Sequence, residues 1–307
     1  MTRRRWWLVG GVSVLVVAAA VAGVLIWQSL ARPDTPQEAA TAYLRALESG
    51  DPAAVTATGI DVSATALGAF AGASHLIEDA EVASIEQTGD AEATADVSFR
   101  LGDEDRTARL DIIEVDGHWI VGSSAFGTST MTADLGSSVG IGEQTVAVGE
   151  AVQLLPAEYA VSAAPSSLLE GSANLLVLPG EDAEVTVEAT ARPAATAAAQ
   201  EQLDEHLAEC TSSDSTTTAG TPPDGCGIRI PWGTEFRAVA DIRYRIEKSP
   251  AITLGTTGFV ADGGVLVATV TGTGTDGAER TTTYRTETWS IRGDIAFTEE
   301  ELVLTAW

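Results

Sequence analysis

No charged residue occurs between Trp6 and Ala31, directly after the arginines at positions 3–5. As a helix this run would be about 39 Å long, more than the roughly 30 Å hydrocarbon core of a bilayer. The apolar stretch of a cleaved signal peptide is shorter, at about 7–15 residues, and no cysteine follows the run to accept a lipid. We therefore predict an uncleaved transmembrane helix over residues 6–31.

The charges around this run predict its orientation. Three arginines precede it, whereas Arg32 alone lies close behind it. Because flanking basic residues stay on the cytoplasmic side of a membrane, we expect residues 1–5 to be a cytoplasmic stub and residues 33–307 to lie outside. The sequence thus predicts a single-pass protein of the cell membrane with extracytoplasmic C-terminal domains.

The exported part is strongly acidic, because all 44 Asp and Glu residues follow Arg32 and the chain carries a net charge of −27. Such a charge repels nucleic acid and anionic lipid, so we expect no nucleic-acid partner. The acidic clusters lack the spacing of a calcium loop and are interpreted as solvated surface. The partners left open are the membrane, reached through the N-terminal helix, and an envelope protein, a wall polymer or a small ligand.

Residues 34–125 open with a strong helix start. Thr35 can cap a helix, Pro36 suits its first position, and Glu38 completes a capping box. Later segments alternate between apolar and polar residues, and the Asp-Gly pair at 116–117 is a tight-hairpin signal. We expect helices followed by a meander of strands.

This order of helix, Gly-Asp-Pro turn, helix and meander resembles the NTF2-like domains of secreted and membrane-anchored proteins. The resemblance implies an α+β cone, and in NTF2-like enzymes an Asp, His or Tyr inside the cone transfers protons. His118 is the candidate here, but alternation places Trp119 on the core side and predicts that His118 points away. A polar cone interior would indicate a pocket, whereas one filled by Tyr43, Leu47, Phe99 and Trp119 would indicate contact with a protein partner.

Residues 130–192 contain short strands at regular intervals with Gly and Pro turns, which is typical of a small β-sandwich. This stretch resembles the PEGA-type surface modules, with the sequence LLPAEYAV in place of their Pro-Gly-x-Tyr turn and Ala157 where a glycine is expected. With its anchor, NTF2-like domain and PEGA-like module, the chain resembles single-pass envelope proteins of actinobacteria.

Residues 193–307 are expected to form a third domain, of the α+β class. It begins with a helix whose apolar face is made of Thr196, Ala199, Leu203, Leu207 and Cys210. Cys210 is the last residue of this buried face, and a loop follows it directly.

The segment from Glu235 to Glu247 alternates cleanly and predicts a half-buried strand. Its inward set is Phe236, Ala238, Ala240, Ile242, Tyr244 and Ile246. Four basic residues gather on this segment or just after it: Arg237, Arg243, Arg245 and Lys248. They are a candidate stripe for docking an anion or a partner, whereas the simpler interpretation is cross-strand pairing with the interleaved acids.

No catalytic motif passes the test of its context. The match to a dinucleotide-binding loop at Gly272–Gly277 is followed by an alternating Thr-rich segment instead of a helix. The match to a nucleophile elbow around Ser138 lacks its helix and its partners. The histidines lack the full set of ligands that a metal site needs. We therefore expect no catalytic residue, no cofactor and no metal.

The only cysteines, Cys210 and Cys226, end a soft loop rich in Ser, Thr, Pro and Gly. Both belong to the exported part, where disulfides form, and their number and spacing suit a structural bond better than a redox motif. We predict a Cys210–Cys226 disulfide. Metal binding by the pair together with His206, four residues before Cys210, is the alternative, but such a site is short of ligands.

The predicted fold class is α+β, with one N-terminal transmembrane helix, an NTF2-like domain over 34–125, a small β-sandwich over 130–192 and a C-terminal α+β domain over 193–307 with the disulfide loop 210–226. The predicted function is a non-catalytic, membrane-anchored binding or assembly protein of the cell envelope. The alternative is an enzyme or small-ligand binder that uses the NTF2-like cone as its pocket.

Overall fold

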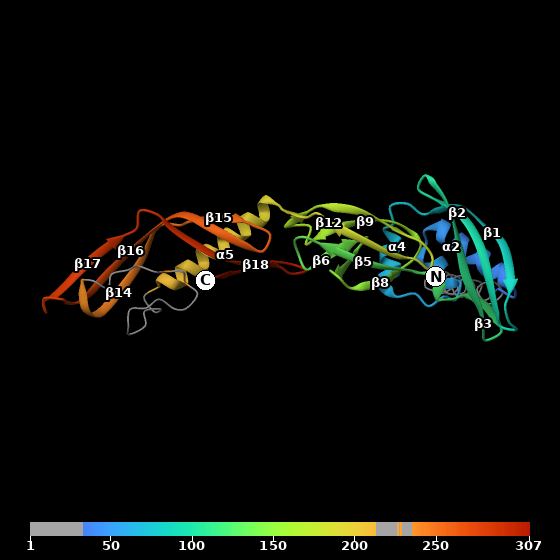
Figure 1. Ribbon diagram of the computed structural model, residues 1–307, viewed down its shortest axis with the longest axis horizontal. Coiled ribbons are helices and arrows are strands. Elements are labelled where there is room, and N and C mark those ends of the chain that lie inside the picture. The colour runs from blue at the N-terminus through green and yellow to red at the C-terminus, as the bar shows by residue number, and fades with distance from the viewer. Residues whose placement is uncertain (1–32, 213–225, 227, 229–234) are drawn as a thin grey trace, which may run out of the picture.

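The computed structural model describes residues 33–212, 226, 228 and 235–307. Within these residues the chain is mainly β, with nineteen strands against four α-helices, so the expected α+β class is wrong. The helices lie at the N-terminal sheet and beside the sheet near the C-terminus, and strands make up most of the rest (Figure 1). No helix in the described ranges is both long and apolar enough to cross a membrane, and the predicted segment 6–31 lies outside those ranges.

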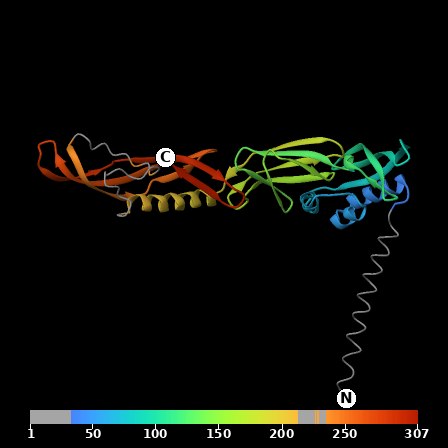
Figure 2. The ribbon, with the colours of Figure 1, turned by 90° about the horizontal axis from the view of Figure 1, so that it is seen from below.

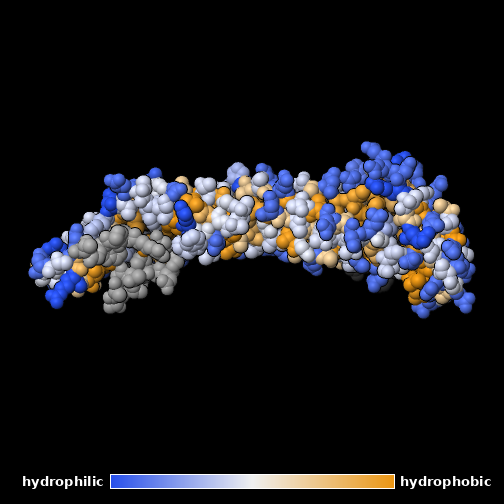
Figure 3. Space-filling model, in the orientation of Figure 1, coloured by the Kyte–Doolittle hydropathy of each residue, from blue (hydrophilic) through white to orange (hydrophobic). Residues whose placement is uncertain are grey.

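Three units follow one another along an elongated molecule (Figures 1 and 2). The N-terminal unit occupies one end, and the hairpin of β16 (Gly258–Gly274) and β17 (Glu279–Arg285) occupies the other. On the face shown in Figure 3, the free end of this hairpin carries hydrophilic side chains. The molecule therefore has two distant ends joined by a middle unit.

In the N-terminal unit the first helix packs on an antiparallel sheet of order β1-β2-β3-β4, and two shorter helices follow it. Its elements are α2 (Pro36–Ser49), α3 (Pro52–Ala57), α4 (Ala64–Ala71), β1 (Ile77–Gln87), β2 (Glu92–Leu101), β3 (Glu104–Val115) and β4 (His118–Val121). The buried face of α2 meets the inward side chains of β2, among them Val97 and Phe99. The 3-10 turn η1 (Ser123–Ala125) leads into the middle unit.

The predicted start of α2 is confirmed, with one difference. The Thr35 side chain accepts a hydrogen bond from the Glu38 amide, and Pro36 is the first helical residue. The Glu38 carboxylate reaches one residue further back than a capping box requires and accepts from the Asp34 amide at 3.0 Å. The helix ends at Gly50, whose φ of 66° suits a residue without a side chain.

The middle unit consists of two packed sheets of order β11-β9-β6-β7 and β12-β5-β8, with the short pair β10-β13 beside them. Its strands are β5 (Gly127–Ala133), β6 (Ser138–Ile141), β7 (Gln144–Ala147), β8 (Ala151–Leu154), β9 (Ala157–Ala164), β10 (Leu169–Glu170), β11 (Ser172–Val177), β12 (Asp182–Val187) and β13 (Thr190–Ala191). The strand β12 pairs with β5 in parallel, whereas the other ladders of these sheets are antiparallel.

Close backbone packing joins the N-terminal and middle units. The amides of Ser74 and His75 donate to the Glu158 carbonyl, and the Glu158 amide donates to the His75 carbonyl at 2.9 Å. Nearby, a side chain at Gly142 would lie 3.0 Å from the Gly68 carbonyl oxygen, with the backbone of α4 on the same side. At Gly142 the main chains of the two units therefore approach too closely to admit a side chain.

The C-terminal unit combines the helix α5 (Pro193–Thr211) with a sheet centred on β16. Its other strands are β14 (Phe236–Lys248), β15 (Ala251–Leu254), β18 (Trp289–Phe297) and β19 (Leu302–Ala306). The first half of β16 pairs with β15 and β18, and its second half pairs with β14 and β17. The change occurs at Gly263 and Gly264, where the β16–β18 register shifts and Gly263 has a φ of 74°.

The middle and C-terminal units are joined without a spacer. Only Arg192 separates β13 from α5, and its amide donates to the Leu168 carbonyl at 2.8 Å while its Nε donates to Leu169 at 2.9 Å. The Ser137 hydroxyl donates to the Phe297 carbonyl at 2.7 Å across the same junction. Side-chain and main-chain contacts thus hold both sides of this connection.

Candidate functional site

The interior of the N-terminal unit is filled by side chains. The four side chains that would fill the cone, those of Tyr43, Leu47, Phe99 and Trp119, are all buried. The Tyr43 hydroxyl donates to the Ala125 carbonyl at 2.8 Å. Burial, and secondarily the nearby Tyr159, raises the pKa of Tyr43 well above its usual value. A neutral, hydrogen-bonded phenol in a packed interior is a structural group.

The two segments that match catalytic motifs, around Ser138 and at Gly272–Gly277, lie in strands and turns and are not followed by a helix, as the sequence predicts. Ser138 begins β6, is 1 % exposed, and pairs with both β7 and β9, with no helix after it. The segment Gly272–Gly277 ends β16 and turns into β17, with the Gly274 amide donating to the Ala278 carbonyl at 2.8 Å. His118 is half-buried on β4, whereas the next residue, Trp119, is buried.

The strand β14 departs from the predicted alternation in its first half. Phe236, Val239 and Ile242 pair with alternate residues of β16 and share the inward face, whereas Ala238 and Ala240 are exposed. The cause is two register shifts, each of which places an extra residue on β14 and reverses the direction of the side chains that follow. The predicted inward set is therefore wrong for Ala238 and Ala240 and correct from Ile242 onward.

These shifts divide the candidate docking stripe. Arg243 and Arg245 lie on the outward face, where the alternation is regular. Arg237 lies within the first irregularity and Lys248 beyond the third, so neither continues that row. Two of the four predicted residues are thus brought together in one regular row.

A third arginine joins this face from a segment that the sequence did not single out. Val267 of β16 pairs with Arg245 of β14 on one side and with Arg285 of β17 on the other. Arg285 Nε donates to the Glu247 carboxylate at 2.7 Å, across the strand between them. This hydrogen bond, more than the charge of Arg285, holds the pKa of the Glu247 carboxyl below its usual value.

Threonine hydroxyls continue the same face toward the tip of the molecule. The Thr269 and Thr283 hydroxyls are 3.4 Å apart, and those of Thr271 and Thr281 are 3.0 Å apart. Each pair is directly opposite in the β16–β17 ladder. We call the outward surface formed by Arg243, Arg245, Arg285 and these four threonines the distal face; the alternating "TVTGTGT" and "TTTYRT" segments are the sequence signal for it.

The distal face carries one ion pair within a strand and one of the expected cross-strand kind. Arg243 Nε lies 3.2 Å from the Asp241 carboxylate of the same strand, and Arg285 pairs with Glu247. All four side chains are exposed by more than a third. Exposed ion pairs contribute about 0–1 kcal/mol to stability, so these arginines are available to exchange their carboxylates for those of a partner.

A groove of about 440 Å³ lies between β14 and the last turns of α5. Its lining residues are Asp204, Ala208, Thr211, Tyr244, Arg245, Ile246, Glu247 and Ser249. Burial raises the pKa of Tyr244 to about 12. Arg245 belongs to both the groove and the distal face, which makes the two continuous.

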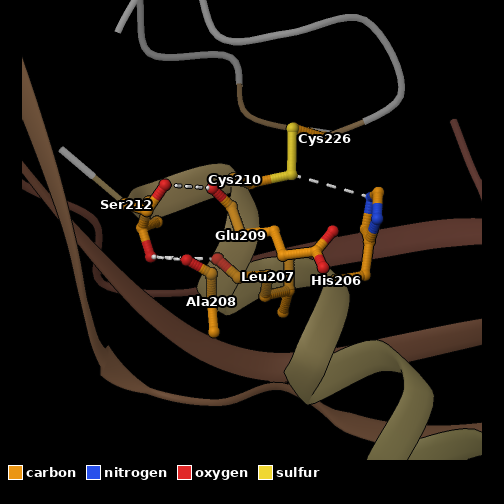
Figure 4. Close-up of a disulfide and its surroundings, with 8 residues drawn as sticks. His206, Leu207, Ala208, Glu209, Cys210, Ser212 and Cys226 are labelled. Carbon is orange, nitrogen blue, oxygen red and sulfur yellow. Dashed lines mark hydrogen bonds between the residues drawn. A yellow bond between two sulfur atoms is a disulfide. The ribbon is translucent and has the colours of Figure 1, made fainter. Parts of the chain in front are cut away.

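The predicted disulfide is confirmed. Cys210 at the end of α5 is bonded to Cys226, with Cα atoms 5.8 Å apart, and both are buried (Figure 4). The predicted apolar face of α5 is present, with Ala195 more deeply buried than Thr196. His206, one turn before Cys210, directs its ring toward the disulfide, with its Nε2 3.7 Å from the Cys210 sulfur.

No family model, no curated protein and no solved structure matches the chain.

Proposed function

We propose that the chain is a non-catalytic binding or assembly protein of the cell envelope, anchored in the membrane by residues 6–31. The main support is the packed interior of the N-terminal unit, where Tyr43 and Trp119 occupy the space that a ligand of an NTF2-like cone would need. Binding at an outer surface then becomes the better hypothesis than chemistry in a pocket.

The elongated shape supports separate roles for the two ends of the molecule, one in anchoring and the other in binding. The segment that we propose as anchor precedes α2 directly, and the distal face lies at the opposite end (Figure 1). Junctions made through main-chain contacts at Glu158 and at Arg192 keep the intervening units in line. In this proposal the N-terminal and middle units form a stalk, and the C-terminal unit meets the partner.

The distal face carries the binding role in this proposal. It gathers Arg243, Arg245 and Arg285 in a chain whose net charge is −27. Because the ion pairs of Arg243 and Arg285 are exposed and weak, these arginines can exchange their carboxylates for those of an anionic partner, such as an acidic envelope protein or a charged wall polymer. Hydroxyls of the paired threonines add hydrogen-bonding groups at regular spacing along the strands.

The test compares the unaltered full chain with the variant Arg243→Gln/Arg245→Gln in co-sedimentation with purified cell walls and in cross-linking on intact cells. An exposed charge contact contributes at most about 1 kcal/mol. Losing two of them is therefore expected to weaken binding by about tenfold. The variant Arg106→Gln/Arg109→Gln, on the N-terminal sheet, is the matched control. Equal binding by all three proteins would refute a role for the distal face.

Orientation has its own test. Protease added outside intact protoplasts is expected to remove nearly all of the chain's mass, because only residues 1–5 are proposed to be cytoplasmic. A large protected fragment would reverse the proposed topology.

A further inference from the structure

Three metal-ligating side chains converge at the end of α5. His206 and Cys210 are four residues apart on the helix, so their side chains share one face, and Cys226 meets them from the other side of the disulfide loop (Figure 4). The donor atoms of these three residues all lie within 4.8 Å of one another. Among the residues that the structure describes, this is the group of His, Cys and carboxylate side chains that could hold a metal ion.

The spacing of the helical pair matches that of two ligands on one zinc ion. Zinc binds cysteine sulfur at about 2.3 Å and histidine nitrogen at about 2.0 Å in a tetrahedron, which places the two donors about 3.6 Å apart. His206 Nε2 lies 3.7 Å from the Cys210 sulfur. These two ligands are therefore already positioned, and only the sulfur of Cys226 must move.

The disulfide blocks this site, because a metal binds the thiolate form of cysteine and neither sulfur can become a thiolate while the two are bonded to each other. Reduction removes that bond and leaves two thiols near the imidazole. The Cα atoms of the cysteines are 5.8 Å apart, and two sulfurs on a tetrahedral zinc are about 3.8 Å apart. Rotation of the Cys226 side chain can supply this separation.

We propose that reduction of Cys210–Cys226 creates a zinc site formed by His206, Cys210 and Cys226, so that the C-terminal unit is tied by a disulfide in one redox state and by a metal in the other. A dithiol reductant supplies two electrons and two protons, is itself oxidised to a disulfide, and yields two thiols. Zinc then displaces one proton from each thiol and binds the two thiolates and the neutral imidazole. Water completes the tetrahedron.

The surroundings suit this exchange. Both cysteines are less than 6 % exposed, so the thiolates would be screened from solvent once the ion neutralises them. The chain's net charge of −27 favours the approach of a cation. The zinc site would hold the end of α5 when the disulfide is absent, whether or not the distal face binds a partner.

The test uses the full chain in detergent under anaerobic conditions. The protein is reduced with a phosphine, freed of reductant, and dialysed against Zn²⁺ with excess Mg²⁺ to saturate exposed carboxylates. We expect one tightly bound zinc per reduced chain beyond what the oxidised chain binds. Cobalt in place of zinc is expected to give the intense sulfur-to-metal absorption of thiolate ligands, only after reduction.

Variants separate this site from adventitious binding. His206→Asn leaves the disulfide intact and is expected to weaken zinc binding to the reduced chain by at least about tenfold, as losses around metal sites do. His75→Asn, which alters a histidine far from the disulfide, is expected to leave zinc binding unchanged. Zinc bound equally by the reduced and oxidised chains, or by the unaltered and His206→Asn chains, would overturn the proposal.

Circular dichroism covers the case in which the reduced chain loses structure. If reduction lowers the strand signal or the melting temperature, zinc is expected to restore it in the unaltered chain and not in Cys210→Ser/Cys226→Ser. Failure of zinc to restore the lost signal would count against the site as firmly as failure to bind.

Discussion

The Gln202 side chain binds the backbone of Leu304 as a neighbouring strand would: its Oε1 accepts from the Leu304 amide at 3.1 Å. Its Nε2 donates to the Leu302 carbonyl at 2.6 Å. On the opposite flank of α5, Gln200 accepts from the Ile252 amide at 2.9 Å and donates to the Pro250 carbonyl at 3.1 Å. Because β15 and β19 are the edges of this part of the sheet, the two glutamines occupy groups that would otherwise be free to pair with another chain.

Replacing Gln202 with leucine is expected to lower the free energy of unfolding by about 1–3 kcal/mol, because two backbone groups lose their partners. Glu201→Leu, at the exposed neighbouring position, is the control and is expected to change stability little. Chemical denaturation of the full-length variants measures both. Equal losses in the two variants would show that the glutamine contributes nothing beyond its helical position.

The double variant Gln200→Leu/Gln202→Leu is expected to associate with itself. It frees hydrogen-bonding groups on both edges, and unpaired edges are templates for intermolecular pairing. Analytical ultracentrifugation across a concentration series measures the association, with Glu201→Leu/Glu205→Leu as the control for added apolar surface. A double variant that sediments like the unaltered chain would contradict this account of the glutamines.

At the junction between α4 and the β6–β7 turn, Gly142→Ala is expected to destabilise more than Gly149→Ala. Both glycines have a positive φ, of 58° and 78°, so alanine is strained at each by about 1–2 kcal/mol. A side chain at Gly149 meets nothing within 4 Å, whereas one at Gly142 lies 3.0 Å from the Gly68 carbonyl oxygen. The difference in melting temperature between the two variants therefore measures the close approach of Gly142 to the backbone of α4. Equal melting temperatures would mean that this junction adjusts to a side chain without cost.

Removing the disulfide with Cys210→Ser/Cys226→Ser is expected to cost about 3 kcal/mol, the chain-entropy value for a closed loop of about 15 residues. The cysteines are 16 positions apart. Thermal unfolding in metal-free buffer measures the loss, and mass spectrometry of the unreduced chain checks the bond. A variant as stable as the unaltered chain would mean that the end of α5 is held by other contacts.

Stability is expected to fall at alkaline pH because of two buried phenols. Burial raises the pKa of Tyr159 as well as that of Tyr43. Above the unfolded pKa of about 10 the unfolded chain releases these protons while the folded chain keeps them, so stability declines by about 1.4 kcal/mol per pH unit for each tyrosine. Below that pH the contribution is fully present.

Tyr159→Phe tests the alkaline effect, because it removes one of the two phenols and its hydrogen bond to the Leu155 carbonyl. The variant is expected to be less stable at neutral pH by about 1 kcal/mol and to lose stability less steeply above pH ~10. Denaturation curves collected across that range measure the slope. An unchanged slope would assign the alkaline loss to other groups.

Local signals in the sequence predicted local structure well. Thr35 and Pro36 begin α2, and Asp116 and Gly117 form a hairpin with φ values of 54° and 79°. In each case the responsible interaction lies within a few residues, so it is visible in the sequence. The same holds for the buried face of α5 and for the disulfide.

Features that depend on distant partners were missed. The inward set of β14 failed at Ala238 and Ala240 because the bulges follow from pairing with β16. The parallel pairing of β12 with β5 joins segments about 50 residues apart and leaves no local pattern. Arg285 reaches the distal face only because β14 and β17 lie on either side of β16. The predicted α+β class was wrong because the few helices have clear start and stop signals in the sequence. The many short strands have only weak signals, so their share of the chain was underestimated.

The strand β16 gives the C-terminal unit a mechanical property. One continuous backbone runs lengthwise through both halves of the unit and is bonded along its sides to β14, β15, β17 and β18 (Figure 1). Tension along the molecule would therefore load these ladders in shear, with many hydrogen bonds sharing the force at once, rather than open them one by one. A partner that pulled on the tip would transmit its pull to the stalk before the unit unravelled.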